Sequence, residues 1–386
     1  MEYDRLMMKY NWQQVDWPKF RYDVTAFQED LYRYAEATGR FAGKFPHLSP
    51  EMQEQAELEL MVAEAVKTSA IEGEFLERKD VMSSIRNNLN LNHPPIVVKD
   101  VRAHGIATLM VDVRRSYAET LTEKNLFSWH RMLFPPGAAA RNVRIGAWRI
   151  HDEPMQVVSG HYGKVKVHFE APASKNVPQE MNKFISWFNK TAPGQSEAIA
   201  PGPVRAAVAH LYFESIHPFE DGNGRIGRAL AEKSLSQGLG RPALTSLSQA
   251  IDAQKKRYYE ALGRAQNSNE ITSWVSYFVK TIMNAEQAAE KLIEFILSKT
   301  KFFDRYKSEM TDRQQRVIAR MLKEGPAGFI GGINATKYMH IAHCSKATAT
   351  RDLAELRDKK ILRQESAGGR STSYSIALTE EQRRRE

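Results

Sequence analysis

Helical periodicity runs through most of this 386-residue chain and constrains its fold more than any other feature. Apolar residues recur at spacings of three and four, the pattern of helices that bury one face. We therefore expect a mainly α-helical protein whose core is a helical bundle. The expected helices span residues 24–42, 50–69, 78–93, 97–118, 123–134, 178–190, 204–216, 225–237, 252–264 and 270–307.

One segment in the middle of the chain departs from this pattern. Apolar residues alternate with other residues at 143–150 and again at 165–169, and Gly160 and Gly163 lie between the two halves. Alternation is typical of strands, and glycines are typical of the turn between them. The sequence therefore predicts one β-hairpin laid across the helical core.

The segment after Met310 predicts a separate architecture, with three short helices followed by two short strands that flank Gly368 and Gly369. This is the order of a winged helix-turn-helix domain. The expected elements are helices at 311–324, 334–340 and 345–360 and strands at 361–364 and 373–377. The chain as a whole then divides into an N-terminal helical domain (1–95), a helical core (96–307) and a winged-helix domain (308–386).

Composition and charge narrow the class of protein. Cys344 is the only cysteine, which excludes an internal disulfide framework and fits a reducing compartment. The chain starts without an apolar signal region, and no apolar run approaches the roughly 18 residues of a membrane helix. We expect a soluble, cytoplasmic protein without membrane contact. Of the net charge of +9, residues 311–386 contribute +6, from 15 Lys and Arg against 9 Asp and Glu. This excess suits a polyanion such as DNA, and it also suits ordinary solvated surface.

The polar chemistry is concentrated between His217 and Arg228, in the sequence HPFEDGNGRIGR. Gly222, Asn223 and Gly224 allow successive N–H groups to converge on an anion, and the next helix points its positive end there. Arg225 and Arg228 are three residues apart, so they emerge on one helix face. The pattern predicts a site for more than one phosphate.

Two residues of this loop suggest a reaction. Asp221 supplies a hard oxygen ligand beside the phosphates, which suits Mg²⁺. His217 titrates near neutral pH, as a general base for a hydroxyl proton must.

These residues match the motif HxFx(D/E)GNGRxxR of Fic-domain proteins, and the resemblance extends over roughly residues 50–300. It implies transfer of AMP from ATP, with Mg²⁺, to a Ser, Thr or Tyr hydroxyl of a target protein. His217 would be the base and Arg225 would neutralise charge on the leaving pyrophosphate. Arg228 would bind the γ-phosphate. The implied nucleotide-binding and metal residues are Asp221, Gly222, Asn223, Gly224, Arg225, Ile226, Gly227 and Arg228, with Asp221 as the Mg²⁺ ligand.

Residues 68–73, with the sequence TSAIEG, resemble the inhibitory motif (S/T)xxxE(G/N) of the Fic class with an N-terminal inhibitory helix. The resemblance implies that Glu72 pairs with Arg228 and keeps the γ-phosphate out. In this family the same glutamate also supports removal of AMP. The direction of the reaction stays open at this point.

Two further segments resemble parts of the family site. Residues 164–172 resemble the Fic flap, whose edge aligns the target segment and brings Val167, His168 and Phe169 to the nucleotide. Tyr258 and Tyr259 resemble the paired tyrosines of the adenine pocket, and a core role for one of them is the alternative. The N-terminal helical domain is interpreted as a packing or homodimer surface.

The prediction is an autoinhibited protein adenylyltransferase that uses Mg-ATP. Two alternatives stay open: a DNA-binding transcriptional regulator with a nucleotide-sensing Fic core, and an enzyme that removes AMP at the same site. For DNA, residues 345–360 offer Lys346, Thr350 and Arg351. Against DNA, the same stretch carries the acids Asp352, Glu355 and Asp358, and winged helices also dock proteins.

Overall fold

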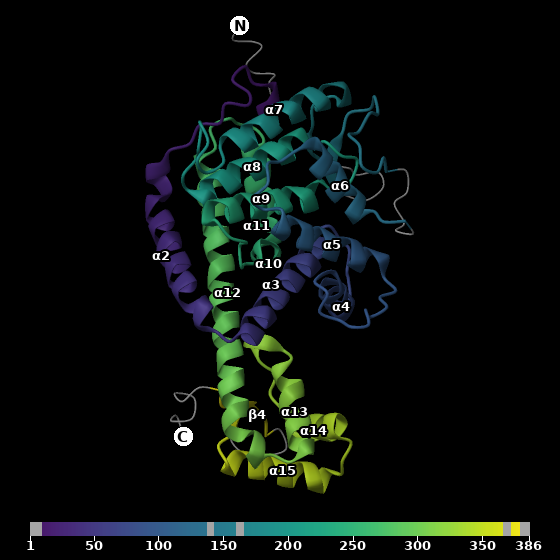
Figure 1. Ribbon diagram of the computed structural model, residues 1–386, viewed down its shortest axis with the longest axis vertical. Helices are drawn as coiled ribbons and strands as arrows, with labels where there is room; N and C mark the ends of the chain where they lie inside the picture. Colours follow the sequence, from purple (N-terminus) through teal and green to yellow (C-terminus); the bar gives the residue numbers. More distant parts are fainter. Residues whose placement is uncertain (1–9, 137–142, 160–165, 366–371, 379–386) are drawn as a thin grey trace. The chain divides into compact units, whose positions relative to one another are not determined.

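The structure is a computed structural model that describes residues 10–136, 143–159, 166–365 and 372–378 (Figure 1). The chain forms two compact units. The larger unit contains residues 1–49 and 53–289, and the smaller one contains residues 50–52 and 290–386. The division into domains at 95 and 307 stays a prediction.

The prediction of a mainly helical protein is confirmed. The longer helices before residue 310 are α2 (Gln28–Lys44), α3 (Pro50–Ile71), α4 (Arg78–Asn88), α5 (Val101–Arg115), α6 (Glu123–Leu133), α7 (Val177–Lys190), α8 (Gly202–Ile216), α9 (Asn223–Leu239), α10 (Leu247–Ala253), α11 (Lys255–Ala265) and α12 (Thr272–Tyr306). The helix expected at 252–264 is interrupted, because the backbone of Gln254 leaves the helical region between α10 and α11.

Helices α8 and α9 lie side by side in the core of the larger unit (Figure 1). Every residue of α8 from Pro203 to Ile216 is buried, as expected for a helix surrounded by others. Residues of α8 and α9 belong to both of the large apolar clusters among the described residues of the larger unit. The turn from α8 to α9 is therefore held by the most buried part of the protein.

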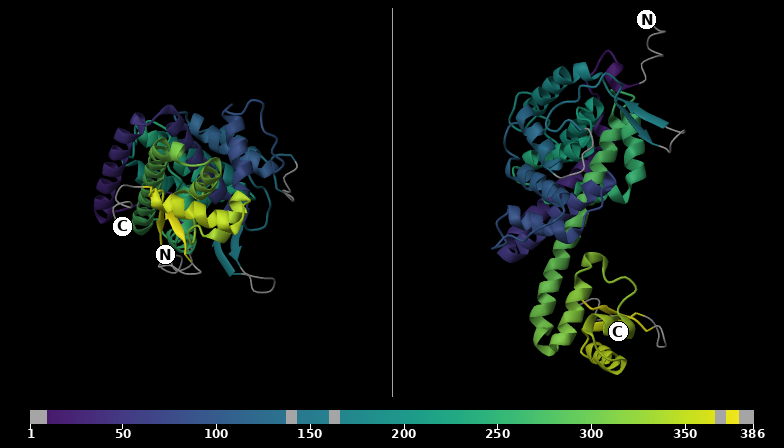
Figure 2. Two further views of the ribbon diagram at one scale, coloured as in Figure 1. Left: turned by 90° about the horizontal axis from the view of Figure 1, so that it is seen from below. Right: turned by 90° about the vertical axis from the view of Figure 1, so that its right-hand side faces the viewer.

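The β-hairpin differs from its prediction at the first strand. Strand β1 (Gln156–Ser159) pairs antiparallel with β2 (Lys166–Glu170), and this hairpin projects from the larger unit in Figure 2. The strand expected at 143–150 is wrong. Trp148 packs on Phe127 and Phe219 instead, whereas Ile145 and Ile150 are exposed, so the alternation in that segment does not correspond to a strand with one buried face. Gly160 and Gly163 lie outside the described residues.

The smaller unit follows the predicted order of elements. Helices α13 (Asp312–Leu322), α14 (Ala335–Ala342) and α15 (Lys346–Asp358) precede the antiparallel strands β3 (Leu362–Gln364) and β4 (Tyr374–Ile376). They enclose a core of their own that includes Ile318, Tyr338 and Leu353. Gly368 and Gly369 lie outside the described residues, and the winged-helix assignment stays a prediction.

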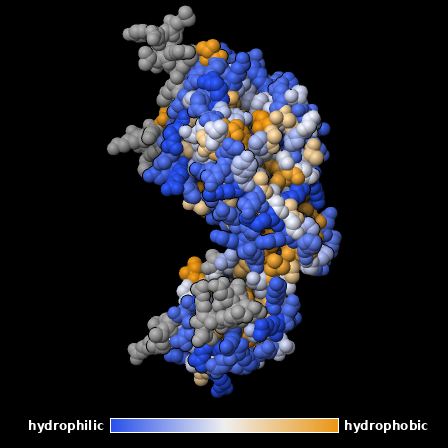
Figure 3. Space-filling model, turned by 90° about the vertical axis from the view of Figure 1, so that its left-hand side faces the viewer, coloured by the Kyte–Doolittle hydropathy of each residue, from blue (hydrophilic) through white to orange (hydrophobic). Residues whose placement is uncertain are grey.

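Hydrophilic residues cover most of the face shown in Figure 3, and hydrophobic ones occur in small groups among them. Within the part of the chain that the structure describes, no helix combines the length and the apolar character needed to cross a membrane.

Candidate active site

His217 lies directly after α8, in the left-handed backbone region at φ 51°. Its N–H donates to the carbonyl of Phe213 at 2.9 Å, and its own carbonyl accepts from Arg149 Nε at 2.8 Å. Arg149 is buried and also donates to the carbonyl of Pro172. Arg149 therefore fixes the backbone at the point where α8 turns into the loop.

The imidazole of His217 is mostly buried, with 15% of the side chain exposed. Its Nδ1 lies 3.7 Å from Oε2 of Glu214. Burial, reinforced by the charge of Arg149, lowers the pKa of His217 to about 4, so the expectation from the sequence that His217 titrates near neutral pH is wrong. The ring is therefore neutral near physiological pH, the form that a general base requires.

The loop after His217 is held by the side chain of Asn223. Its Oδ1 accepts from the N–H of Phe219 at 2.9 Å, and its Nδ2 donates to the carbonyl of Phe219 at 2.8 Å. Phe219 is fully buried and stacks on His130, with 4.2 Å between the ring centroids. The amide of Asn223 thus serves the loop itself, which leaves its backbone N–H for an anion.

His130 fixes the other side of the loop. Its Nδ1 accepts from the N–H of Gly146 at 2.9 Å, so its Nε2 carries the proton that bonds the carbonyl of Asp221 at 3.1 Å. Sequence reasoning missed this residue and Arg149, because both lie far from the loop in the chain and belong to no recognisable pattern.

The N-terminus of α9 has the form expected of an anion site. Gly222 has φ 82°, and a Cβ there would lie 3.2 Å from Leu133 and Phe134. A glycine therefore lets the chain turn into α9 with its first N–H groups free of helical partners. The carboxylate of Asp221 is half exposed at this end of the helix.

Asp221 fits a magnesium ion that is shared with phosphates. Among the described residues, no group of three or more His, Cys, Asp and Glu side chains could hold a metal ion alone. Mg²⁺ in nucleotide sites is usually held by one or two carboxylates together with phosphate oxygens and waters. One exposed carboxylate beside an anion site meets that requirement.

Arg228 is fully buried and bonded to α3. Its Nε donates to Thr68 Oγ1 at 2.7 Å, and its Nη2 donates to Glu72 Oε1 at 2.7 Å. Burial alone would raise the pKa of Glu72, but the charge and hydrogen bond of Arg228 outweigh it and lower that pKa. A Cβ on Gly224 would lie 2.2 Å from Glu72 Oε1, so a glycine is needed for the carboxylate to approach.

Arg225 has an acidic partner of its own. Its Nη1 donates to Glu74 Oε2 at 2.8 Å, and its side chain is 3% exposed. Glu74 follows Gly73, which ends the α3 segment with φ 83°. Sequence reasoning missed Glu74. The available signal was a second glutamate two residues after Glu72, on the far side of a glycine that turns the chain.

The paired tyrosines have different environments. Tyr258 is 2% exposed, and its hydroxyl lies 2.8 Å from Nε2 of His210, whereas Tyr259 is 42% exposed. Burial raises the pKa of Tyr258 well above its usual value. Tyr258 therefore belongs to the core, and of this pair only Tyr259 is exposed; its place in an adenine pocket stays a prediction.

The hairpin is held by the first described residues of the chain. On β2, Val167 is half-buried, His168 is exposed, and Phe169 is buried against the ring of Tyr10 at 5.0 Å. Trp12 Nε1 donates to the carbonyl of Glu170 at 2.7 Å. The part of the predicted flap at 164–165 lies outside the described residues.

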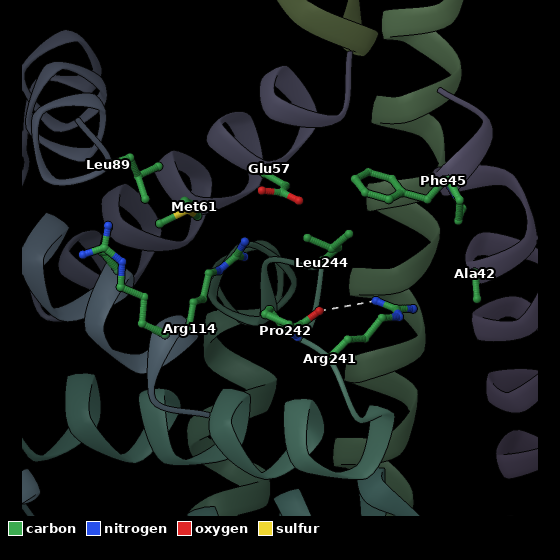
Figure 4. Close-up of a pocket in the computed structure, with 12 residues that line it drawn as sticks. Ala42, Phe45, Glu57, Met61, Leu89, Arg114, Arg241, Pro242 and Leu244 are labelled. Carbon is green, nitrogen blue, oxygen red and sulfur yellow. Dashed lines mark hydrogen bonds between the residues drawn. The ribbon is translucent and has the colours of Figure 1, made fainter. Parts of the chain in front are cut away.

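A separate cavity of about 460 Å³ contains none of the loop residues (Figure 4). Met61 and Leu244 contribute to its wall, and Arg241 donates to the carbonyl of Pro242 at 3.3 Å. Arg114, also on its wall, is paired with Glu232 at 3.1 Å. The loop from His217 to Arg228 therefore does not line this cavity.

Comparison with known proteins identifies part of this architecture. Residues 120–235 match the family model described as Fic/DOC family. The chain contains a Fic domain. Residues 10–91 match a second model, described as a domain of unknown function (DUF4172). The Fic match thus includes the whole loop from His217 to Arg228, whereas Glu72 and Glu74 lie in the other matched segment.

Curated relatives that match the Fic domain are named as enzymes. The protein adenylyltransferase Fic of Nematostella vectensis is 27% identical over 156 residues, which are 40% of this chain and 32% of that protein. A probable protein adenylyltransferase of Aquifex aeolicus is 29% identical over 119 residues, 28% of this chain and 35% of that protein. The matches span about a third of the length of these relatives.

Solved structures share the fold. A Fic family protein from Desulfovibrio desulfuricans superposes with a TM-score of 0.54 at 18% identity, covering 93% of this chain and 98% of that one. A Fic-domain signalling protein from Bacteroides thetaiotaomicron gives a TM-score of 0.50 at 17% identity, covering 69% of this chain and 97% of that one.

Proposed function

We propose that this protein transfers AMP from Mg-ATP to a Ser, Thr or Tyr hydroxyl of a target protein. The observation that carries the proposal is a neutral His217 at the start of the loop that leads to the N-terminus of α9, whose first turns contain two buried arginines, Arg225 and Arg228. The adenylyltransferase names of the Fic relatives support the same reaction.

In the proposed reaction, His217 takes the hydroxyl proton while the hydroxyl oxygen attacks the α-phosphorus. The bond from that phosphorus to the pyrophosphate oxygen breaks, and pyrophosphate leaves with the electron pair. Arg225 offsets the charge on the leaving group, and Arg228 binds the γ-phosphate. Backbone N–H groups at Gly222–Gly224 hold the other phosphates. Asp221 would hold Mg²⁺, which neutralises phosphate charge.

We further propose that the described arrangement is the inhibited one. Glu72 and Glu74 each occupy one of the two arginines that the triphosphate would need. Both pairs are largely buried, where charge-assisted hydrogen bonds are strong. ATP binding in the productive pose would have to replace two carboxylates by phosphate oxygens.

The test uses ATP labelled at the α- or the γ-phosphate, with the E72G variant and a lysate of the source cells as a supply of targets. The expected result is label from α on protein, lost when His217→Ala is added. Label from γ alone means kinase chemistry, and label from neither contradicts the proposal. Release of AMP from a modified target by the unsubstituted chain, but not by E72G, would favour AMP removal.

A second candidate function belongs to the smaller unit. Asp352 is buried and bonded to Arg313 at 2.7 Å and to Tyr338 at 2.7 Å, so it does not face a ligand of α15. Lys346 and Arg351 on the same helix are exposed. This distribution removes one of the acids that would repel a nucleic-acid backbone.

We propose duplex DNA as a ligand of this helix. The test is binding of the full chain to a fluorescent duplex at increasing salt, with Lys346→Ala and Arg351→Ala combined, and the exposed Lys256→Ala as control. Loss of binding in the α15 variant alone is expected. Absence of binding by the unsubstituted chain at low salt contradicts the proposal.

A further inference from the structure

We propose that Glu214 is a positioning residue for His217. Its carboxyl accepts a hydrogen bond from the Nδ1–H group of the imidazole, so that Nε2 keeps the lone pair that takes the hydroxyl proton. The inference rests on the proposed role of His217 as the base.

The two side chains face each other inside the protein. Glu214 lies one helical turn before His217, and the distance from Oε2 to Nδ1 is 3.7 Å, with exposed fractions of 6% and 15%. Nδ1 of His217 and Oε1 of Glu214 are buried, and neither makes a hydrogen bond of good geometry among the described residues. The backbone carbonyl of Glu214 approaches the ring and raises the pKa of His217, so it is the competing acceptor. Buried polar atoms rarely stay unpaired, and hydrogen bonds of catalytic groups often shorten in the reactive complex.

Helix α9 also leaves space for this carboxyl. A Cβ on Gly227 would lie 2.4 Å from Glu214 Oε1 and 3.2 Å from Nδ1 of His210. Gly227 therefore lets α9 pass close to the carboxyl of α8. The last glycine of the loop motif thus makes room for Glu214, in addition to any role near the nucleotide.

The geometry decides which nitrogen of His217 can act as the base. Because Nδ1 is buried beside Glu214, the exposed part of the ring must include other atoms. A neutral imidazole carries one proton, so a proton held on Nδ1 leaves Nε2 unprotonated. After proton transfer the ring is an imidazolium, and a carboxyl at Nδ1 stabilises that charge.

The charged groups around Glu214 come from several elements. Burial raises the pKa of Glu214 to about 8, Arg228 on α9 lowers it and Glu72 raises it. His210 is neutral, since burial lowers its pKa to about 4, and Tyr258 bonds to its far nitrogen. A protonated carboxyl still offers one oxygen to the Nδ1 proton, and positive charge on the ring favours the ionised form.

The experiment compares E72G with E72G/E214Q, because glutamine preserves the shape of the side chain. We expect kcat for AMP transfer to fall about 10²-fold, with KM for ATP within about twofold. The acid limb of the pH profile should move to lower pH, because loss of the carboxyl lowers the pKa of His217. In ¹⁵N NMR of the imidazole, the proton should lie on Nδ1 in E72G and shift toward Nε2 in the double variant.

Glu180→Gln is the matched control, since Glu180 is also largely buried but bonds Trp17 Nε1 at 2.8 Å. It should change neither the pH profile nor the tautomer. An E214Q variant that keeps both kcat and the Nδ1 proton overturns the inference, as does a tautomer with the proton on Nε2 in E72G. If E72G transfers no AMP, the proposed function fails, and the NMR comparison still decides the role of Glu214.

Discussion

The loop at 217–228 and helix α15 both carry basic side chains, but their surroundings are opposite. Arg225 and Arg228 are buried, and each donates to a carboxylate from segment 72–74. Lys346 and Arg351 on α15 are exposed. A buried charge needs a partner, whereas an exposed one is satisfied by water. The structure therefore shows which carboxylates Arg225 and Arg228 bind. It does not show what Lys346 and Arg351 bind.

The largest effect should come from His217→Ala in the E72G background. Removal of a general base should lower AMP transfer about 10³-fold, because no other side chain of the loop has a nitrogen that is both basic and unprotonated near neutral pH. AMP incorporation into target protein measures the rate, and thermal unfolding followed by circular dichroism checks the fold. A variant that keeps a tenth of the activity would remove His217 from the mechanism.

The next effect concerns the pH dependence of the buried loop. Burial lowers the pKa of His130 from 6.5 to about 4, against the opposing effect of the Asp221 carbonyl. The native state then binds fewer protons than the unfolded state between these values, so stability is present above pH 6.5 and is lost as pH falls toward 4. The loss should reach roughly 3 kcal/mol.

Denaturant unfolding at several pH values tests this expectation, with His130→Asn as the comparison. The variant should be less stable at neutral pH but should lose less stability on acidification. Equal slopes for both proteins would mean that His130 does not stay neutral in the fold.

Glu74→Ala should have a smaller effect and should sharpen the distinction between the two arginines. This change leaves Arg225 with only the carboxylate of Asp221, 3.6 Å away, and should raise AMP transfer about tenfold, less than E72G, because the Glu72–Arg228 pair remains. The neighbouring Glu77→Ala serves as control, since Glu77 makes no side-chain cap bond to α4. Activation equal to that of E72G would show that the two contacts act as one.

The smallest effect is expected on α15. Arg351→Ala should change the free energy of unfolding by less than about 0.5 kcal/mol, because the side chain is exposed. Asp352→Ala should be clearly more destabilising, since it leaves Arg313 and Tyr338 without their acceptor. Equal effects would contradict the contrast between buried and exposed charges.

The sequence predicted those features that depend on local pattern. Helical periodicity located most helices, and the contact of Glu72 with Arg228 is present, while its inhibitory effect stays a prediction. The roles of Glu74 and Glu214 could not be predicted, because they depend on which chain segments pack together. Trp148 shows the same limit, since alternation indicated a strand where the ring instead packs on Phe219.

The absence of a side chain at Gly224 limits which substitutions this position can accept during evolution. A side chain there would collide with Glu72, and it would also crowd the space beside Arg228 that the proposed γ-phosphate needs. Substitutions at this position would therefore disturb both the proposed inhibitory contact and the proposed phosphate site. If the proposed inhibition holds, substitutions that raise activity are expected at 68–74, where they leave the loop unaltered.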